Sequence, residues 1–255
     1  MRYKRYIILI TPIVIWLLSW AYLMRADLFY YVLASGAFLI LISVKLVDYS
    51  RRNNWPLFAI TPVLLFLSLA LYSAIIISSF WIKAIFFVSA AFLFVYFKHL
   101  YYFFNSNDFE EAERRAGNLD NLIIAAGFLI SFSVSAVWFG LPAFLNWPPV
   151  YTLPILATVI LLLFVQFSFF SPNKSRPLGL TAFLIVLGLI EVAWALSLLP
   201  LNFNILGLFM SIYYYFGLTA LRLKWSGSLN RESVKLPLAL SAAVIFLLFI
   251  TARWL

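Results

Sequence analysis

The sequence lacks cysteine and contains a single histidine, His99, among its 255 residues. Without cysteine, the chain has no disulfide, no thiolate metal site and no cysteine nucleophile. One histidine also excludes the histidine-rich zinc motifs of membrane proteases. We therefore expect neither a bound metal nor a cofactor, and no set of catalytic residues is found.

Charge is also scarce, because only 11% of the residues are charged while 65% are hydrophobic and 20% are aromatic. A soluble domain is about 25% charged and about 45–50% apolar. A water-soluble fold of this length has too little interior for so much apolar surface, so lipid must be part of its solvent. We expect an integral membrane protein of a bacterial or archaeal plasma membrane, with the lipid bilayer as its main partner.

The apolar residues form runs that are long enough for membrane helices, which need about 20 apolar residues. These runs lack the alternation of barrel strands, so they predict an all-α polytopic transmembrane helix bundle. The nine expected spans are 6–24, 28–46, 55–79, 81–103, 120–142, 148–170, 178–199, 203–222 and 236–252.

The positions of the basic residues predict how these spans are oriented. If the N-terminus is cytoplasmic, 15 of the 18 Lys and Arg residues fall on the cytoplasmic side, and the other three are Arg25, Lys83 and Arg253. Cytoplasmic loops are enriched in Lys and Arg. The pattern therefore favours nine spans with the N-terminus inside and the C-terminus outside, and it explains the net charge of +9 without a nucleic-acid partner.

One segment between spans, residues 105–119, has a helical pattern of its own within the single membrane domain, residues 1–255. Asp108 and Glu111 have the spacing of a capping box, and Gly117 suits a C-terminal cap. These features predict a short cytoplasmic amphipathic connector. A solvated connector is favoured over a docking or regulatory element.

Two pairs of segments resemble each other within the chain: 10–22 resembles 60–72, and 29–57 resembles 150–178. They suggest a duplicated four-span unit, with halves 1–104 and 120–224 and an extra span at 236–252. Chance similarity between apolar helices is the alternative. Parallel halves would favour a binding crevice between them.

Glu191 is the one acidic residue in the middle of an apolar run. A charge at the bilayer centre costs about 2.5–3.5 kcal/mol. We place Glu191 about eight residues from the outer end of its span, roughly 12 Å deep. One helical stripe contains Glu191 together with Thr181, Leu184, Gly188 and Ala195. Because small residues mark helix contacts in membranes, this stripe is expected to face protein.

Lys83 is the candidate partner of Glu191, because it lies about three residues inside the outer end of its own span. The pair would be structural, or Glu191 would instead be neutralised by a proton and serve transport. Ser131 and Ser135, one turn apart, are weaker polar candidates that can bond helix carbonyls or cross a helix interface.

The sequence supports two functions from different classes. Nine spans, proline-interrupted helices and one deep carboxylate favour a small transporter or a lipid-handling protein with a small or hydrophobic substrate. Short loops and few polar residues instead favour a non-catalytic scaffold or partner subunit, and they are compatible with a homo-oligomer or a larger membrane complex. An enzyme is not favoured, because enzymes need several polar groups arranged together.

Overall fold

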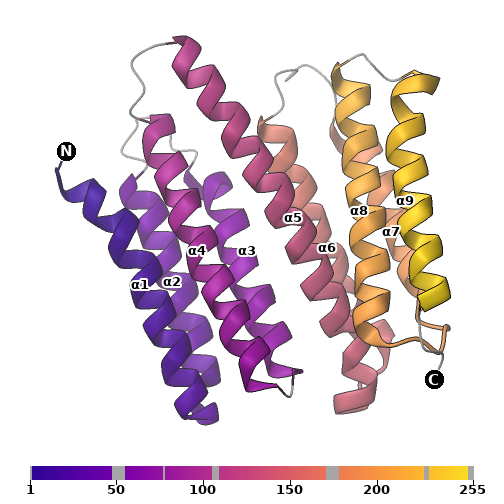
Figure 1. Ribbon diagram of the computed structural model, residues 1–255, viewed down its shortest axis with the longest axis horizontal. Coiled ribbons are helices and arrows are strands. Elements are labelled where there is room, and N and C mark those ends of the chain that lie inside the picture. Colours follow the sequence, from indigo (N-terminus) through magenta and orange to yellow (C-terminus); the bar gives the residue numbers. More distant parts are fainter. Residues whose placement is uncertain are drawn as a thin grey trace. The chain divides into compact units, whose positions relative to one another are not determined.

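The computed structural model describes residues 2–47, 55–76, 78–104, 109–170, 178–226 and 230–251. Within these ranges every regular element is a helix, as the apolar runs predict. The elements, in chain order, are α1 (Arg2–Met24), η1 (Ala26–Leu28), α2 (Phe29–Val47), α3 (Trp55–Ala74), α4 (Ser79–Phe104), α5 (Phe109–Leu145), α6 (Pro149–Phe170), α7 (Leu178–Leu196), α8 (Phe203–Ser226) and α9 (Arg231–Thr251) (Figure 1).

Seven stretches of these helices are long and apolar enough to cross a membrane. They are Tyr6–Met24, Ala26–Val47, Trp55–Ala74, Ser79–Phe104, Arg114–Pro142, Val150–Ser168 and Phe203–Lys224. The apolar stretches of α7 and α9 are shorter, at Ala182–Leu196 and Pro237–Leu248. The all-helical architecture is confirmed, while membrane crossings by α7 and α9 stay a prediction.

Local signals in the sequence set several helix ends. Asn146 follows the last residue of α5 with φ 55°, in the left-handed region that asparagine tolerates after a helix. Pro149 is the first residue of α6, where its missing N–H is no loss. Before α8, the side chain of Asn202 accepts a hydrogen bond of 2.9 Å from the backbone N–H of Asn204 and caps the helix.

The connector expected at 105–119 does not form a separate helix. Helix α5 runs from Phe109 to Leu145 without a break, so the connector and the fifth span are one element. Gly117 lies inside this helix, and the expected C-terminal cap at this position is wrong. A glycine within a helix is tolerated at a cost of about 1 kcal/mol relative to alanine. Asp108 lies outside the described residues.

The chain forms two compact units, Met1–Ala126 and Gly127–Leu255, and the division falls within α5. In the first unit, α1 contacts α2 and α4, and α3 also contacts α2 and α4, so the four helices close into a bundle. The fully buried side chains of this unit include Ile15, Ile40, Leu65, Phe66 and Tyr96. The predicted repeat halves stay a prediction.

A proline inside α3 explains one of the hydrogen bonds between helices of the first unit. Pro62 has no N–H, so the carbonyl of Phe58, four residues earlier, loses its usual helical donor. The hydroxyl of Tyr96, in α4, donates to this carbonyl at 2.6 Å. Tyr96 is fully buried, so the bond closes a gap in the backbone pairing where water is excluded.

A second bond joins α1 to α2. The hydroxyls of Thr11 and Ser43 lie 2.8 Å apart, and the Ser43 hydroxyl also lies 2.7 Å from the carbonyl of Leu39, to which it donates. Thr11 is therefore the donor to Ser43. Both residues are buried, so the bond fixes how α1 and α2 face each other.

In the second unit, α6 contacts α7, α7 contacts α8, and α8 contacts α9. Here glycine allows close packing. A Cβ on Gly207 of α8 would lie 2.8 Å from the Cβ of Ala136 in α5 and 2.9 Å from its backbone nitrogen. A Cβ on Gly127 of α5 would lie 2.7 Å from the hydroxyl of Tyr214 in α8. The second half of α5 thus packs against α8 at distances that only glycine permits.

Candidate functional site

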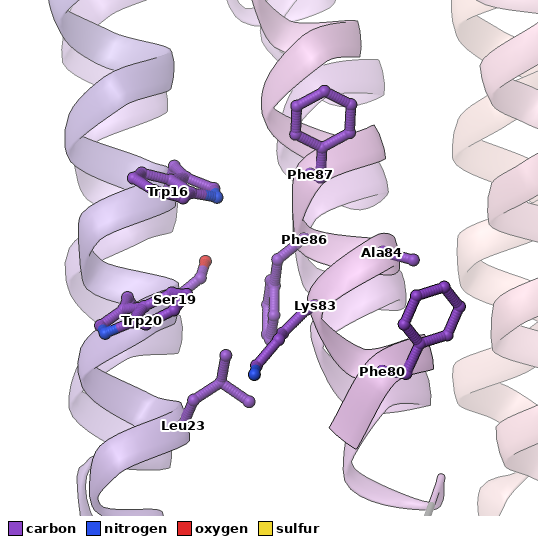
Figure 2. Close-up of a pocket in the computed structure, with 9 residues that line it drawn as sticks. All are labelled: Trp16, Ser19, Trp20, Leu23, Phe80, Lys83, Ala84, Phe86 and Phe87. Atoms are coloured by element: carbon purple, nitrogen blue, oxygen red, sulfur yellow. The ribbon is translucent and has the colours of Figure 1, made fainter. Parts of the chain in front are cut away.

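A groove between α1 and α4 is the candidate site of the first unit (Figure 2). Its cavity volume is about 340 Å³, within the usual range of about 300–1,000 Å³ for small-molecule sites. The α1 wall consists of Trp16, Ser19, Trp20 and Leu23. The α4 wall consists of Phe80, Lys83, Ala84, Phe86 and Phe87. We call this the α1/α4 groove.

The lining follows helical spacing on both walls. On α1 the lining positions recur every three or four residues, from Trp16 through Trp20 to Leu23. On α4 the same spacing connects Phe80, Lys83 and Phe87. Each helix therefore presents one stripe to the groove. The packing of α1 against α4, which includes an edge contact between Tyr22 and Phe86 at 6.0 Å, brings the two stripes together.

Lys83 supplies the charge of the groove. Its Nζ lies 5.6 Å from the centroid of the Trp20 ring, within the range of a cation–π contact. Figure 2 shows its amine directed from α4 toward α1. The side chain is exposed, so the ammonium is available to another group in the groove.

Two further polar groups belong to the α1 wall. The Ser19 hydroxyl donates to the carbonyl of Ile15 at 2.8 Å, and its oxygen can still accept a bond. Trp16 and Trp20 lie with ring centroids 5.8 Å apart, and each is 40% exposed. The indole nitrogen of Trp16 points toward α4 in Figure 2. The wall is therefore aromatic, with a few polar atoms at its surface.

Glu191 lies in α7 of the second unit, whereas Lys83 lies in the first. Their pairing stays a prediction. Among the described residues, Glu191 makes no hydrogen bond or ion pair, and its side chain is exposed. Because α7 ends at Leu196 rather than at 199, Glu191 is five residues from the helix end, about 7.5 Å along the axis. Its depth in a membrane stays a prediction.

The stripe around Glu191 is not packed against other helices of its own unit, so the expected contact of this stripe with protein stays a prediction. Leu184 and Ala195 are exposed, and a Cβ on Gly188 would meet nothing within 4 Å. The buried face of α7 is a different one. It consists of Ala182, Val186, Leu189 and Ala193. The exposed stripe is apolar on both sides of the carboxylate, and it includes Leu187 and Trp194.

The serines of α5 are buried, but their hydroxyls are not bonded as expected. The Oγ atoms of Ser131 and Ser135 have no hydrogen-bond partner among the described residues, and the same holds for Nε1 of Trp138. These three residues share one helical stripe. Each is at least 97% buried, with exposures of 1%, 0% and 3%. Thr181 lies in α7, but its side chain is outside the described residues.

In the part of the chain that the structure describes, no three His, Asp or Glu residues gather as a metal site. Comparisons of the chain with models of known protein families, with curated proteins and with solved structures found no match in any of the three. The functional assignment therefore depends on the groove itself.

Of the predicted site residues, only Lys83 lies in the groove. The sequence did not single out Trp16, Ser19, Trp20 or Leu23 of the α1 wall. Their spacing of three to four residues was a usable signal for one face of α1. The sequence carried no signal for which helix faces α1, because any of the other apolar helices could have covered that face.

Proposed function

We propose that this protein is a lipid-handling integral membrane protein that binds a bilayer amphiphile in the α1/α4 groove. The single observation that carries the proposal is the lining of the groove, in which aromatic and aliphatic side chains surround one cation and one hydroxyl. Such a surface suits a molecule with an apolar chain and a polar end. Both helices of the groove are among the seven that are long and apolar enough to cross a membrane, which supports a ligand from the bilayer.

The position of the groove along its helices supports an amphiphile over a wholly apolar ligand. Lys83 is the fifth residue of α4, and Trp20 lies four residues before Met24, the last residue of α1. Both residues therefore lie near one end of the bundle, where Trp and Lys meet the lipid headgroups. The polar end of a bound molecule would reach Lys83, and its chain would run along Trp16 and Phe87.

We also propose that this end of the bundle faces outward. The distribution of basic residues supports a cytoplasmic N-terminus, with nine crossings and an outer C-terminus. The loop between α3 and α4, which precedes Lys83, then lies outside. The ligand of the groove is accordingly an amphiphile of the outer leaflet.

Photo-crosslinking tests this function. A neutral monoacylglycerol with a diazirine in its acyl chain is incorporated into liposomes that contain the protein, and labelled peptides are mapped. We expect labelling on both walls of the groove, in 16–23 of α1 and 80–87 of α4. Ala84→Trp places a large ring in the groove and should lower this labelling several-fold.

Ala34→Trp is the matched control, because Ala34 is an exposed alanine of α2 in the same unit. It should leave the labelling of the groove unchanged. Labelling spread evenly over the exposed faces of α1, α2 and α4, and unaffected by Ala84→Trp, would contradict the proposal.

A second function, a partner subunit of a membrane complex, is favoured by one observation, the exposed face of α7. Glu191 has no partner there among the described residues, and apolar side chains surround it. A membrane helix with a hydrogen-bond donor would match this face. If this is the function, Glu191→Leu should reduce the size of the native complex extracted from membranes, while Ala84→Trp should not.

A further inference from the structure

We propose that the polar end of the ligand in the α1/α4 groove is an anion, a phosphate or a carboxylate that carries one negative charge and contacts Lys83. This inference rests on the proposed function, because it names the chemistry of the amphiphile's headgroup. It follows from the charges and hydrogen-bonding groups of the lining.

The lining contains one cation and no carboxylate. An ammonium provides three donors and no acceptor, and an indole N–H is a donor only. The Lys83 amine points toward α1 in Figure 2, and the Trp16 indole nitrogen points toward α4. The groups that meet in the groove therefore offer donors and positive charge. They match an anionic oxygen and disfavour a headgroup whose outer group is an amine.

The aromatic walls do not make the groove a site for a cationic headgroup. The face of Trp20 already carries the Lys83 ammonium, at 5.6 Å from the ring centroid. A second cation placed there would be repelled by the first. An anion instead completes a charge-assisted contact, while Trp20 supports the ammonium from the other side.

The charges beyond the end of α1 do not alter this balance. Arg25 follows α1, and Asp27 lies in the short helix η1. One is basic and the other acidic, and both are exposed, so they offset each other at short range. The net positive charge of the groove therefore comes from Lys83.

Apolar surface next to this charge sets the affinity for the anion. A salt bridge in water is worth little, because water screens it. Trp16, Phe80 and Phe87 flank Lys83 with ring surface that excludes water once a chain occupies the groove. The contact between the anion and Lys83 is then stronger than one on an open surface.

The test compares four lipids that share one acyl chain and differ only in the headgroup. They are lysophosphatidylglycerol, palmitate, the neutral monopalmitoylglycerol and the zwitterionic lysophosphatidylcholine. Binding to the purified full-length protein is measured in a nonionic detergent at fixed salt. We expect the two singly charged lipids to bind about tenfold more tightly than the neutral one, as one charge-assisted contact supplies.

Lys83→Gln should reduce this preference to less than about twofold, and Lys83→Arg should keep it. Lys98→Gln is the matched control, because Lys98 is an exposed lysine of the same helix at the opposite end. It should leave the preference unchanged. If only lysophosphatidylglycerol binds tightly, the anionic group that contacts Lys83 is a phosphate. If only palmitate binds tightly, this group is a carboxylate.

Equal binding of the neutral and charged lipids would overturn the anionic headgroup. An equal loss of preference in Lys83→Gln and Lys98→Gln would also overturn the proposed contact with Lys83, because the effect would then come from overall charge. Both outcomes leave the proposed function intact as long as the neutral diazirine lipid still labels the groove. Loss of that labelling, by contrast, removes the amphiphile itself.

Discussion

In the first unit, buried hydroxyls reach across helices, whereas in the second unit the buried hydroxyls of α5 have no partner among the described residues. Tyr96 donates to the Phe58 carbonyl, and Thr11 bonds with Ser43. Ser131 and Ser135 are buried to the same extent without such bonds. Ser89 of the first unit is also buried with no partner for its hydroxyl among the described residues. A buried hydroxyl therefore joins two helices only where a partner on the facing helix lies within reach.

In the second unit, close approach of the helices at glycine is the clearest feature. Gly207 brings α8 against Ala136 of α5, and Gly217 brings α8 against Ile185 of α7, where an added Cβ would lie 2.9 Å from the Ile185 Cγ2. Between membrane helices, lipid provides no hydrophobic driving force, so tight packing and hydrogen bonds must supply the attraction. Close packing is also present in the first unit, where a Cβ on Gly36 of α2 would meet the ring of Phe66 in α3.

The largest expected effect is a break in the close packing of the second unit. In Gly207→Ala, the new Cβ would meet the Cβ, backbone nitrogen and Cα of Ala136 at 2.8–3.0 Å. Backbone atoms cannot move aside as a flexible side chain can, so we expect a loss of about 3 kcal/mol in unfolding free energy. Equilibrium unfolding in mixed micelles measures it.

Gly188→Ala is the matched control for this substitution, since a Cβ there would meet nothing within 4 Å. It should be neutral or stabilising by up to about 1 kcal/mol, because alanine favours helices. Equal losses for the two variants would show that glycine acts through helix propensity and not through contact between α5 and α8.

A smaller effect is expected when the polar bond of the first unit is removed. Tyr96→Phe removes the hydrogen bond from the buried tyrosine hydroxyl to the Phe58 carbonyl, which should cost about 2 kcal/mol. Ser135→Ala removes a buried hydroxyl that has no partner among the described residues. It should change the unfolding free energy by less than about 0.5 kcal/mol. The same unfolding assay compares the two variants.

Pro62→Ala provides an internal check on the Tyr96 variant, because alanine restores the N–H that a helix directs to the Phe58 carbonyl. In this background, Tyr96→Phe should lose most of its effect. If its effect is unchanged, the tyrosine hydroxyl acts through something other than its bond to the Phe58 carbonyl.

The elements of the fold could be predicted from the sequence better than their contacts. Apolar runs give helices directly, because in lipid a backbone has few ways to pair its polar groups. The continuous α5 was missed because Gly117 and the charges of 109–115 resemble a helix end. A local pattern cannot show that the next span continues the same helix.

The candidate site was predictable only in part, for a similar reason. Lys83 stood out as a charge within a span, but Trp16 and Ser19 look like ordinary membrane residues until α4 packs against them. Glu191 stood out equally, and its small neighbours suggested a helix contact. The structure buries the opposite face of α7, because Ala182 and Ala193 serve as the packing residues there.

The smallest expected effect concerns the two charges that the sequence predicts as a pair. Lys83 has a ring partner in the first unit, whereas Glu191 lies on an exposed apolar face of the second. A cycle of Lys83→Met, Glu191→Leu and the double variant measures their coupling in unfolding free energy. Because the Lys83 ammonium is held over Trp20, we expect the two effects to add within about 0.5 kcal/mol. A coupling above about 1 kcal/mol would contradict this expectation and support an ion pair between Lys83 and Glu191. If the effects add and Glu191→Leu is stabilising, the carboxyl is costly to the fold, as expected for a membrane-facing carboxylate if α7 crosses the bilayer.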